Sequence, residues 1–442
     1  MKKPFRLRIL SYMGLVLLLC FVAVAAVSAQ GPGTWVSSFT VQNPSTTETA
    51  SVSVEIYDSS GTSVWTDSTT IAAGQSQLWY VPNLSGLADG RYSVVVSSSI
   101  PVVAITNLQS SSPNTGGSYG GVADTETRTT LYLPGVYYEY YGYISAIALQ
   151  NADTADADIS ITFYNASGTV VDTLTDTIPA SASAVFDQAD QAADLGTGYI
   201  GSAVVESTNG KSLAAMVSIY GNNEYYAYNA FASGSTVAYA PVIMNNYYGW
   251  LTSLTVQNID TADAMVTLTY SNGVERNATI PPNTSWLQYT PNDPDIPVGA
   301  LIGATVESTN GKSIVVLVNE GNFNNNSAAS YNGFSDGSTT VSAPVIMNYY
   351  YDWITSVTVQ NVDTADADVL LTYSNGMTKT ATILPGGTAL WYQPNDGLPS
   401  GFLGSIVITS TNGKKLVAII NEGNEVTSEA GDWLMCYNAF PQ

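Results

Sequence analysis

The chain has 442 residues, no histidine, and 35 acidic against 12 basic residues, which gives a net charge of −23 at pH 7. A surface this acidic repels phosphate backbones and anionic lipid headgroups, so nucleic acid is excluded as a partner. Without histidine the chain also lacks the side chain whose usual pKa lies nearest neutrality.

The first 29 residues have the layout of a secretory signal peptide. Basic residues precede an apolar run from Met13 to Val27, and Ser28 and Ala29 stand before Gln30. We therefore expect cleavage after Ala29 and a secreted protein, extracellular or at the cell surface. Processing leaves eight basic and 35 acidic residues, a net charge of −27. No later run reaches the roughly 18 apolar residues of a membrane helix, so we expect no transmembrane segment in the mature chain.

One phrase occurs four times: an aromatic residue, six further residues, then Gln-Asn. The copies run from Trp35 to Asn43, Tyr143 to Asn151, Trp250 to Asn258 and Trp353 to Asn361. Successive glutamines lie 108, 107 and 103 residues apart, too far for a solenoid unit of roughly 20–50 residues and close to the usual size of a domain. We predict a signal peptide at 1–29 and four domains at 30–126, 127–232, 233–335 and 336–442.

Within a repeat, the pattern is that of short strands. In the third repeat, apolar residues alternate from Trp250 to Val256 and from Ala264 to Tyr270, as in half-buried strands. Asn272-Gly273 follows, which predicts a hairpin with a type I′ turn. Sustained helical periodicity is absent after residue 29.

Two later phrases mark the ends of the repeats. Ser-Thr-Asn-Gly-Lys occurs at 207–211, 308–312 and 410–414, and Tyr-Asn-x-Phe occurs at 228–231, 331–334 and 437–440. The first repeat lacks both and is the divergent copy. About seven short strands in a hundred residues predict an all-β fold: four tandem immunoglobulin-like antiparallel β-sandwich domains.

Clustered aspartates follow the Gln-Asn phrase in three repeats. Calcium prefers oxygen ligands of this kind, so these residues are candidate calcium ligands, although short Asp/Thr loops also need no explanation beyond turn propensity. We expect no other cofactor. The candidate ligands are Asp153, Asp156, Asp158, Asp260, Asp263, Asp363, Asp366 and Asp368.

Aromatic clusters occur where we expect one domain to pass to the next. Tyrosine and tryptophan combine a flat apolar face with a polar edge, which suits packing between domains or stacking on sugar rings. We favour interdomain packing and keep glycan contact as the alternative. The residues are Tyr137, Tyr138, Tyr140, Tyr141, Tyr247, Tyr248, Trp250, Tyr349, Tyr350, Tyr351 and Trp353.

Cys436 is the single cysteine of the mature chain, so an intrachain disulfide is excluded. It aligns with Ala227 and Ser330, which favours a small buried side chain over an intermolecular disulfide.

Five Asn-x-Ser/Thr sites in expected turns could accept glycans in a host that adds them. They are Asn83, Asn165, Asn277, Asn283 and Asn325.

A connector such as Ala343-Pro-Val-Ile-Met347 occurs three times for four repeats. If it is an edge strand, either the first or the last domain lacks a strand that its siblings have. An open edge pairs readily with another chain. We therefore hypothesise head-to-tail assembly with copies of itself into a filament or lattice, by strand donation.

These phrases resemble those of exported bacterial surface proteins built from tandem immunoglobulin-like repeats. The resemblance implies a surface or matrix role and supplies no catalytic site. Our first interpretation is a non-enzymatic structural protein, and the alternative is a multivalent adhesin or glycan-binding protein. Glycoside cleavage by paired carboxylates would need a pair confined to one repeat, whereas the acidic positions here mostly recur.

Overall fold

The computed structural model describes residues 18–22, 33–191, 194–424 and 431–442. The predicted signal peptide and its cleavage site lie outside these residues, except for a strand at Leu18–Val22. Antiparallel strands dominate the described residues and form sandwiches, so the all-β prediction is confirmed. None of the described helices is long and apolar enough to cross a membrane. The helical elements are α1 (Gln188–Gln191), η1 (Val81–Asn83), η2 (Asp124–Glu126), η3 (Thr290–Asn292) and η4 (Gln393–Asn395).

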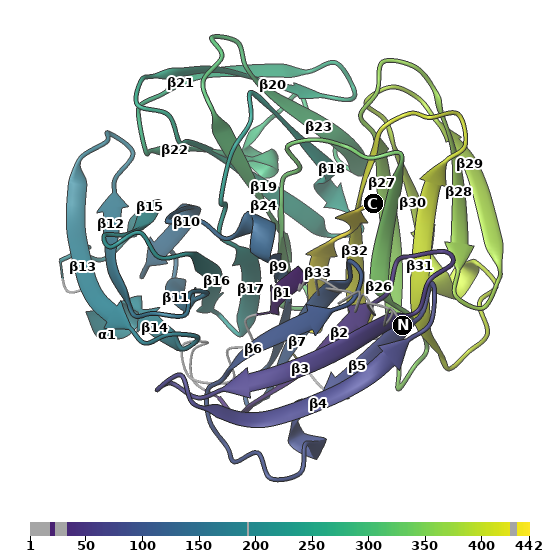
Figure 1. The fold of residues 1–442 in the computed structure, drawn as a ribbon. Coiled ribbons are helices and arrows are strands. Elements are labelled where there is room, and N and C mark those ends of the chain that lie inside the picture. Colours follow the sequence, from purple (N-terminus) through teal and green to yellow (C-terminus); the bar gives the residue numbers. More distant parts are fainter. Residues whose placement is uncertain (1–17, 23–32, 192–193, 425–430) are drawn as a thin grey trace, which may run out of the picture.

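The strands fall into four domains, one for each copy of the Gln-Asn phrase (Figure 1). The first domain has β1 (Leu18–Val22), β2 (Trp35–Gln42), β3 (Ala50–Tyr57), β4 (Ser63–Ile71), β5 (Ser76–Tyr80), β6 (Ser93–Ser98), β7 (Val103–Ser111), β8 (Asn114–Gly120) and β9 (Val122–Ala123). The second has β10 (Thr130–Tyr138), β11 (Ile144–Asn151), β12 (Ala157–Tyr164), β13 (Val170–Ile178), β14 (Ser183–Asp187), β15 (Tyr199–Ser207), β16 (Leu213–Gly221) and β17 (Glu224–Asn229). The third has β18 (Val237–Tyr247), β19 (Trp250–Asn258), β20 (Ala264–Tyr270), β21 (Glu275–Ile280), β22 (Ser285–Tyr289), β23 (Ala300–Ser308), β24 (Ile314–Asn322) and β25 (Ser327–Asn332). The fourth has β26 (Thr340–Asn348), β27 (Trp353–Asn361), β28 (Ala367–Tyr373), β29 (Thr378–Ile383), β30 (Thr388–Tyr392), β31 (Phe402–Ser410), β32 (Leu416–Asn424), β33 (Leu434–Asn438) and β34 (Phe440–Pro441).

Each domain packs two sheets with one strand order. In the fourth domain the sheets run β29-β28-β31-β26-β34 and β30-β27-β32-β33. The first domain repeats this order, and the second repeats it without a fifth strand in the first sheet. Pairing of β18 with β19 joins the two sheets of the third domain. The first strand pairs with the sixth, so the domains share the sandwich architecture of immunoglobulin domains and not their ABED and CFG strand order.

The connector belongs to the domain that follows it. Strand β10 pairs with β15, β18 with β23, and β26 with β31. Each connector bulges at its proline, where the register shifts. A buried tyrosine of the Tyr-Asn-x-Phe phrase stabilises the bulge, since the Tyr331 hydroxyl donates to the carbonyl of Val242 at 2.6 Å.

The Gln-Asn phrase has a structural role. The buried Asn258 side chain donates to the carbonyls of Ile280 at 2.7 Å and Ala262 at 2.9 Å, which ties β19 to the end of β21. Gln257 reaches the neighbouring domain and donates to the carbonyl of Ala203 at 3.4 Å. The asparagine contacts recur in all four domains, so the repeated phrase marks how a domain is closed.

The turn that follows β20 differs from the type I′ prediction. Gly273 has a φ of +85°, and Asn272 is not among the residues with positive φ. The Asn272 side chain accepts a hydrogen bond from the amide of Val274 at 3.2 Å. The asparagine therefore acts by bonding the backbone, and the glycine alone supplies the left-handed conformation.

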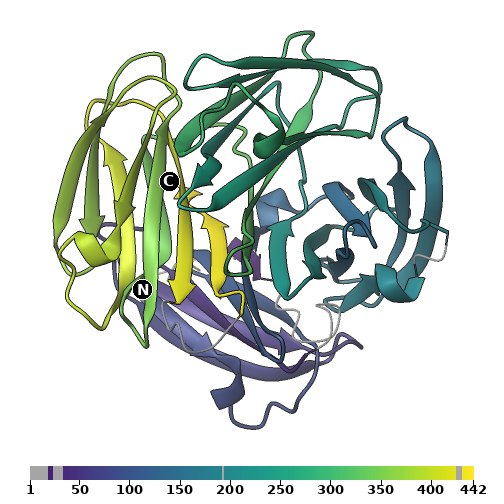
Figure 2. The same cartoon turned by 180° about the vertical axis from the view of Figure 1, so that it is seen from behind.

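The four domains close into a ring (Figures 1 and 2). The edge strands β8, β17, β25 and β33 lie around its centre, each against the next, and β33 also lies against β8. The chain folds back so that its last domain contacts its first.

Apolar side chains join neighbouring cores at the junctions. Leu317 of the third domain packs in the core of the second, Ile419 of the fourth in that of the third, and Ile105 of the first in that of the fourth. Met216 packs with Trp35 at the junction of the first and second domains. These residues share one position in β24, β32, β7 and β16, so one contact is repeated around the ring.

Asparagines of the Tyr-Asn-x-Phe phrase link the central strands. The side chain of Asn332 bonds both the amide (3.1 Å) and the carbonyl (2.7 Å) of Asn229. Asn438 bonds the amide and carbonyl of Asn332 in the same way, at 3.1 and 2.6 Å. Asn229 donates to the carbonyl of Gly120 at 2.8 Å. We call this arrangement the asparagine clamp.

Candidate functional site

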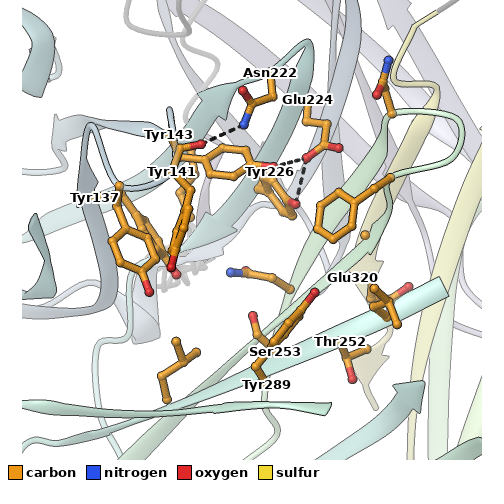
Figure 3. Close-up of a pocket in the computed structure, with 18 of the residues that line it drawn as sticks. Tyr137, Tyr141, Tyr143, Asn222, Glu224, Tyr226, Thr252, Ser253, Tyr289 and Glu320 are labelled. Atoms are coloured by element: carbon orange, nitrogen blue, oxygen red, sulfur yellow. Dashed lines mark hydrogen bonds between the residues drawn. The ribbon is translucent and has the colours of Figure 1, made fainter. Parts of the chain in front are cut away.

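A cleft of about 660 Å³ lies between the second and third domains (Figure 3). One wall comes from the turn between β10 and β11 and from β17, and the other comes from β19 and the end of β22. Its lining is rich in tyrosine, with asparagine and glutamate between the rings. The lining includes Tyr141, Tyr143, Asn222, Glu224, Tyr226, Tyr289 and Glu320.

A second cleft, of about 680 Å³, lies between the third and fourth domains. It uses the corresponding elements: the turn between β18 and β19 on one side, and β27 with the end of β30 on the other. Tyr248 takes the place of Tyr141, and Tyr392 takes that of Tyr289. The clefts are therefore a repeated feature of the ring.

One tyrosine in each of three equivalent turns is almost fully exposed. Tyr141, Tyr248 and Tyr351 have 81%, 86% and 81% of their surface accessible. Their φ angles are +49°, +52° and +48°. Bulky residues rarely adopt this left-handed conformation, and such outliers concentrate at functional sites. The fold thus holds three aromatic rings outward at a cost in backbone energy.

The remaining predicted aromatics mostly pack inside their own domain. Tyr137 is buried, its ring centroid 5.8 Å from that of Tyr140. The turns lie between the first two strands of one domain, so their expected position at a domain boundary in the chain is wrong, although they face a boundary in space. The predicted aromatic residues that pack against a core are Tyr138, Tyr140, Tyr247, Trp250, Tyr350 and Trp353. Tyr349 is exposed.

Glu224 lies buried at the edge of the first cleft. Its carboxylate accepts hydrogen bonds from the hydroxyls of Tyr143 and, at 3.2 Å, Tyr226 (Figure 3). Burial raises the pKa of Glu224 above its usual value, and burial also raises that of Tyr143. The carboxylate orients two tyrosine rings, which gives the cleft wall a fixed shape.

Glu320 and Glu422 are fully buried at the junctions. Glu320 accepts from the side-chain amide of Asn421, and Glu422 from that of Asn107, both at 2.8 Å. Burial raises the pKa of each glutamate to about 8. Our reading of the sequence missed both. The signal was present, because Asn-Glu-Gly-Asn at 319–322 and 421–424 places a carboxylate twice within apolar strands.

Asp432 is another buried carboxylate that the sequence reading missed. Its oxygens accept from the amides of Tyr225 (2.7 Å) and Ala328 (2.8 Å), and its own amide donates to the carbonyl of Asn114 at 2.7 Å. It therefore touches three other domains from the fourth. These contacts indicate that Asp432 helps to hold the four domains together.

The predicted calcium ligands have partners within the protein. Asp153, Asp260 and Asp363 each lie 3.4–3.6 Å from the amine of a lysine in the Asn-Gly-Lys turn. Backbone amides of the following threonines lower the pKa of Asp260 and Asp363. Among the described residues, no three acidic, cysteine or histidine side chains gather as a metal site would require. Calcium binding stays a prediction, and these contacts do not support it.

The other aspartates of these loops are also engaged. Asp158 and Asp368 each accept from a threonine hydroxyl at 2.8 Å. Asp156 accepts from the amide of Ala180 at 3.2 Å, while the backbone carbonyls of Asp263 and Asp366 accept from an asparagine. The loops are thus internally bonded turns.

Cys436 is buried in β33, and burial raises the pKa of its thiol well above the usual value.

Among the predicted glycan acceptors, Asn83 and Asn325 are exposed and Asn165 and Asn283 half-buried. Asn277, which we expected in a turn, lies in strand β21 with its side chain exposed.

No family model matches the chain, and no curated protein matches it. Solved structures that align with one domain include Thermotoga maritima 1070 (19% identity, 23% of this chain and 94% of that one, TM-score 0.19). The Anabaena sensory rhodopsin transducer aligns over 20% of this chain and 91% of its own, at 21% identity and a TM-score of 0.18. A tetra-tandem repeat from the extending region of a large adhesion protein aligns over 96% and 99%, at 13% identity and a TM-score of 0.11. These TM-scores are too low to establish a shared fold.

Proposed function

We propose that this chain is a non-enzymatic, secreted protein of the cell surface or matrix whose ring binds glycan chains through its repeated clefts. The observation that carries the proposal is the display of Tyr141, Tyr248 and Tyr351 at equivalent turns, each more than four-fifths exposed.

The chemistry of the clefts suits a sugar. An exposed tyrosine ring offers an apolar face on which a pyranose can stack, and its hydroxyl can bond the ring's substituents. Asn222 and Asn292 line the first cleft and supply amide donors and acceptors. Weak sites repeated on one rigid body raise the overall affinity for a polymer without any new contact.

The test removes the displayed rings. Tyr141→Asn, Tyr248→Asn and Tyr351→Asn, combined in one variant, keep a residue type that tolerates positive φ. We expect binding to polysaccharide, measured by glycan array and then calorimetry on each positive glycan, to fall by about 10²-fold or more, because avidity is lost with the sites.

The matched control is Leu384→Ala, which removes an exposed side chain outside both clefts. It should leave binding unchanged. Equal binding by the triple variant and the native protein, or no binding of any glycan by the native protein, would overturn the proposal.

Assembly of copies head to tail is our weaker candidate. The fourth and first domains already contact each other: Ser405 donates to the carbonyl of Gly74 at 2.7 Å, and Ser76 to that of Pro344 at 2.8 Å. Ser285 and Pro134 make the corresponding bond between the third and second domains, also at 2.8 Å. The first and fourth domains therefore already cover the surfaces through which they would contact other copies. A filament would need a different surface. Light scattering at high concentration tests this, and a monomer would reject it.

A further inference from the structure

In three domains the connector fills one position in the sheet. It pairs with the sixth strand of its domain, as β26 does with β31. On its other side it meets the residues that follow Tyr-Asn-x, as in the pairs Ser342–Phe440 and Tyr132–Phe231. The connector is thus held on both sides, and without it the sixth strand would be an open edge.

The first domain has no connector, and the N-terminal segment takes that place. Strand β1 pairs with β6 from Leu18–Ser98 to Val22–Val94, and with β9 through Cys20–Ala123. The sheet order β4-β3-β6-β1-β9 matches β29-β28-β31-β26-β34 strand for strand.

The register matches as well. Ser98 pairs with Val52 as Ser410 does with Val369, which equates β6 with β31 position by position. With β6 and β31 aligned in this way, Val96 corresponds to Ile408. Cys20 pairs with Val96 as Val341 pairs with Ile408, so Cys20 occupies the position of Val341. The position beside β6 is therefore a site for one strand in a defined register.

Cleavage after Ala29 would remove this strand. Only five residues would remain before Trp35, where β2 starts, too few to run along β6 and still reach β2. Alternate residues among the five positions of β6 that pair with β1 would then carry unpaired amides and carbonyls, while the others stay bonded to β3. Such an edge is a template for another strand.

We propose that the processed first domain binds, beside β6, an extended strand supplied by another polypeptide. Other copies of this chain are poor donors, because β10, β18, β26 and β34 in the described residues all pair within their own chain. The connectors indicate the chemistry of the donor: alternating apolar residues with a proline at the bulge, as in Ala343-Pro-Val-Ile-Met347. The net charge of −27 favours neutral or basic flanks. This inference does not depend on glycan binding.

The test uses the protein secreted and processed by a host, with its N-terminus established by intact mass. The probe is a labelled synthetic peptide with the sequence of residues 340–348. We expect saturable binding. In hydrogen exchange we expect the β6 amides that face the β1 position to exchange at least about 10-fold faster without the peptide than with it. Strand β23, paired on both sides with β18 and β20, is the internal control and should not change.

Two further controls separate strand pairing from adhesion. The same peptide N-methylated at alternate residues cannot form the backbone bonds and should not bind. A variant with residues 340–348 fused through a flexible linker ahead of residue 33 should have protected β6 amides and no affinity for the peptide.

Four results would overturn the proposal. These are an unprocessed N-terminus, protection in the processed protein alone of the β6 amides that face the β1 position, a stable dimer of processed chains in which those amides are protected, and equal binding of the N-methylated peptide.

Discussion

Two junctions of the ring are built with buried carboxylates and two with aliphatic residues at the same strand position. Glu320 and Glu422 occupy it in the third and fourth domains, and the register places Ile219 and Leu108 there in the second and first. The domains meet in one geometry either way. The comparison teaches that the ring does not need these carboxylates for its shape, because the apolar contacts beside them set the packing.

The carboxylates change how the junctions respond to their surroundings. A buried acid costs desolvation energy that a hydrogen bond only partly offsets, and replacing it with an apolar residue is often neutral or stabilising. One oxygen of each glutamate has no hydrogen-bond partner among the described residues. Junctions three-to-four and four-to-one should therefore each gain a dependence on pH from their glutamate.

The largest expected effect is that of pH on the carboxylate junctions. The pKa of about 8 in the folded protein, against 4.5 for the exposed side chain, means that the folded state holds protons that the unfolded state has lost. The contribution of these two glutamates to stability is therefore largest below about pH 4.5. It falls as the pH rises from there to about 8, and each glutamate contributes a loss of about 1.4 kcal/mol per pH unit. Thermal unfolding from pH 5 to 9 measures this loss.

The double variant Glu320→Gln and Glu422→Gln should flatten this profile, because the amide cannot ionise. An unchanged slope in the double variant would show that other groups, such as Asp432, dominate.

A smaller effect is expected from removing the donor to one carboxylate. Asn421→Ala leaves Glu320 buried without a partner and should cost about 2–3 kcal/mol. The matched change Asn319→Ala lies at the junction where Ile219 replaces the glutamate, so it should cost about 1 kcal/mol. Chemical denaturation of both variants measures the difference. Equal losses would contradict the role given to the carboxylate.

The smallest effect concerns Cys436. Ser330 donates to the side-chain oxygen of Asn319 at 2.7 Å, and Ser118 does so to Asn107 at the same distance. Cys436 stands opposite Asn421 in the same register, and that oxygen of Asn421 has no partner among the described residues. Cys436→Ser should supply the bond and raise the free energy of unfolding by about 1 kcal/mol. A loss of stability would show that the thiol packs better than a hydroxyl bonds.

Much of each domain follows from local pattern. Alternation from Ala264 to Tyr270 appears as alternating burial in β20, and the turn at Gly273 lies where it was expected. These features depend on residues close in the chain, which a period of two and a glycine reveal. The all-β class could therefore be predicted.

The ring could not be predicted, because it depends on residues about one hundred positions apart. Nothing local in Tyr331-Asn332 indicates that the asparagine bonds the backbone of Asn229. The clefts are equally hidden, since Tyr141 and Tyr289 come from different domains. The aromatic clusters were visible in the sequence, whereas the division between packed rings and displayed rings depends on the turn geometry.

The asparagine clamp has one gap, and the gap has a mechanical consequence. Gly120 stands in the first domain where the other domains have asparagine, so no side-chain amide reaches from it to the backbone of Asn438. That joint lies between the first and fourth domains, which do not follow one another in the sequence. Under tension the first and fourth domains should separate at this joint while all four sandwiches stay folded. Single-molecule stretching should record a short, reversible extension before any domain unfolds.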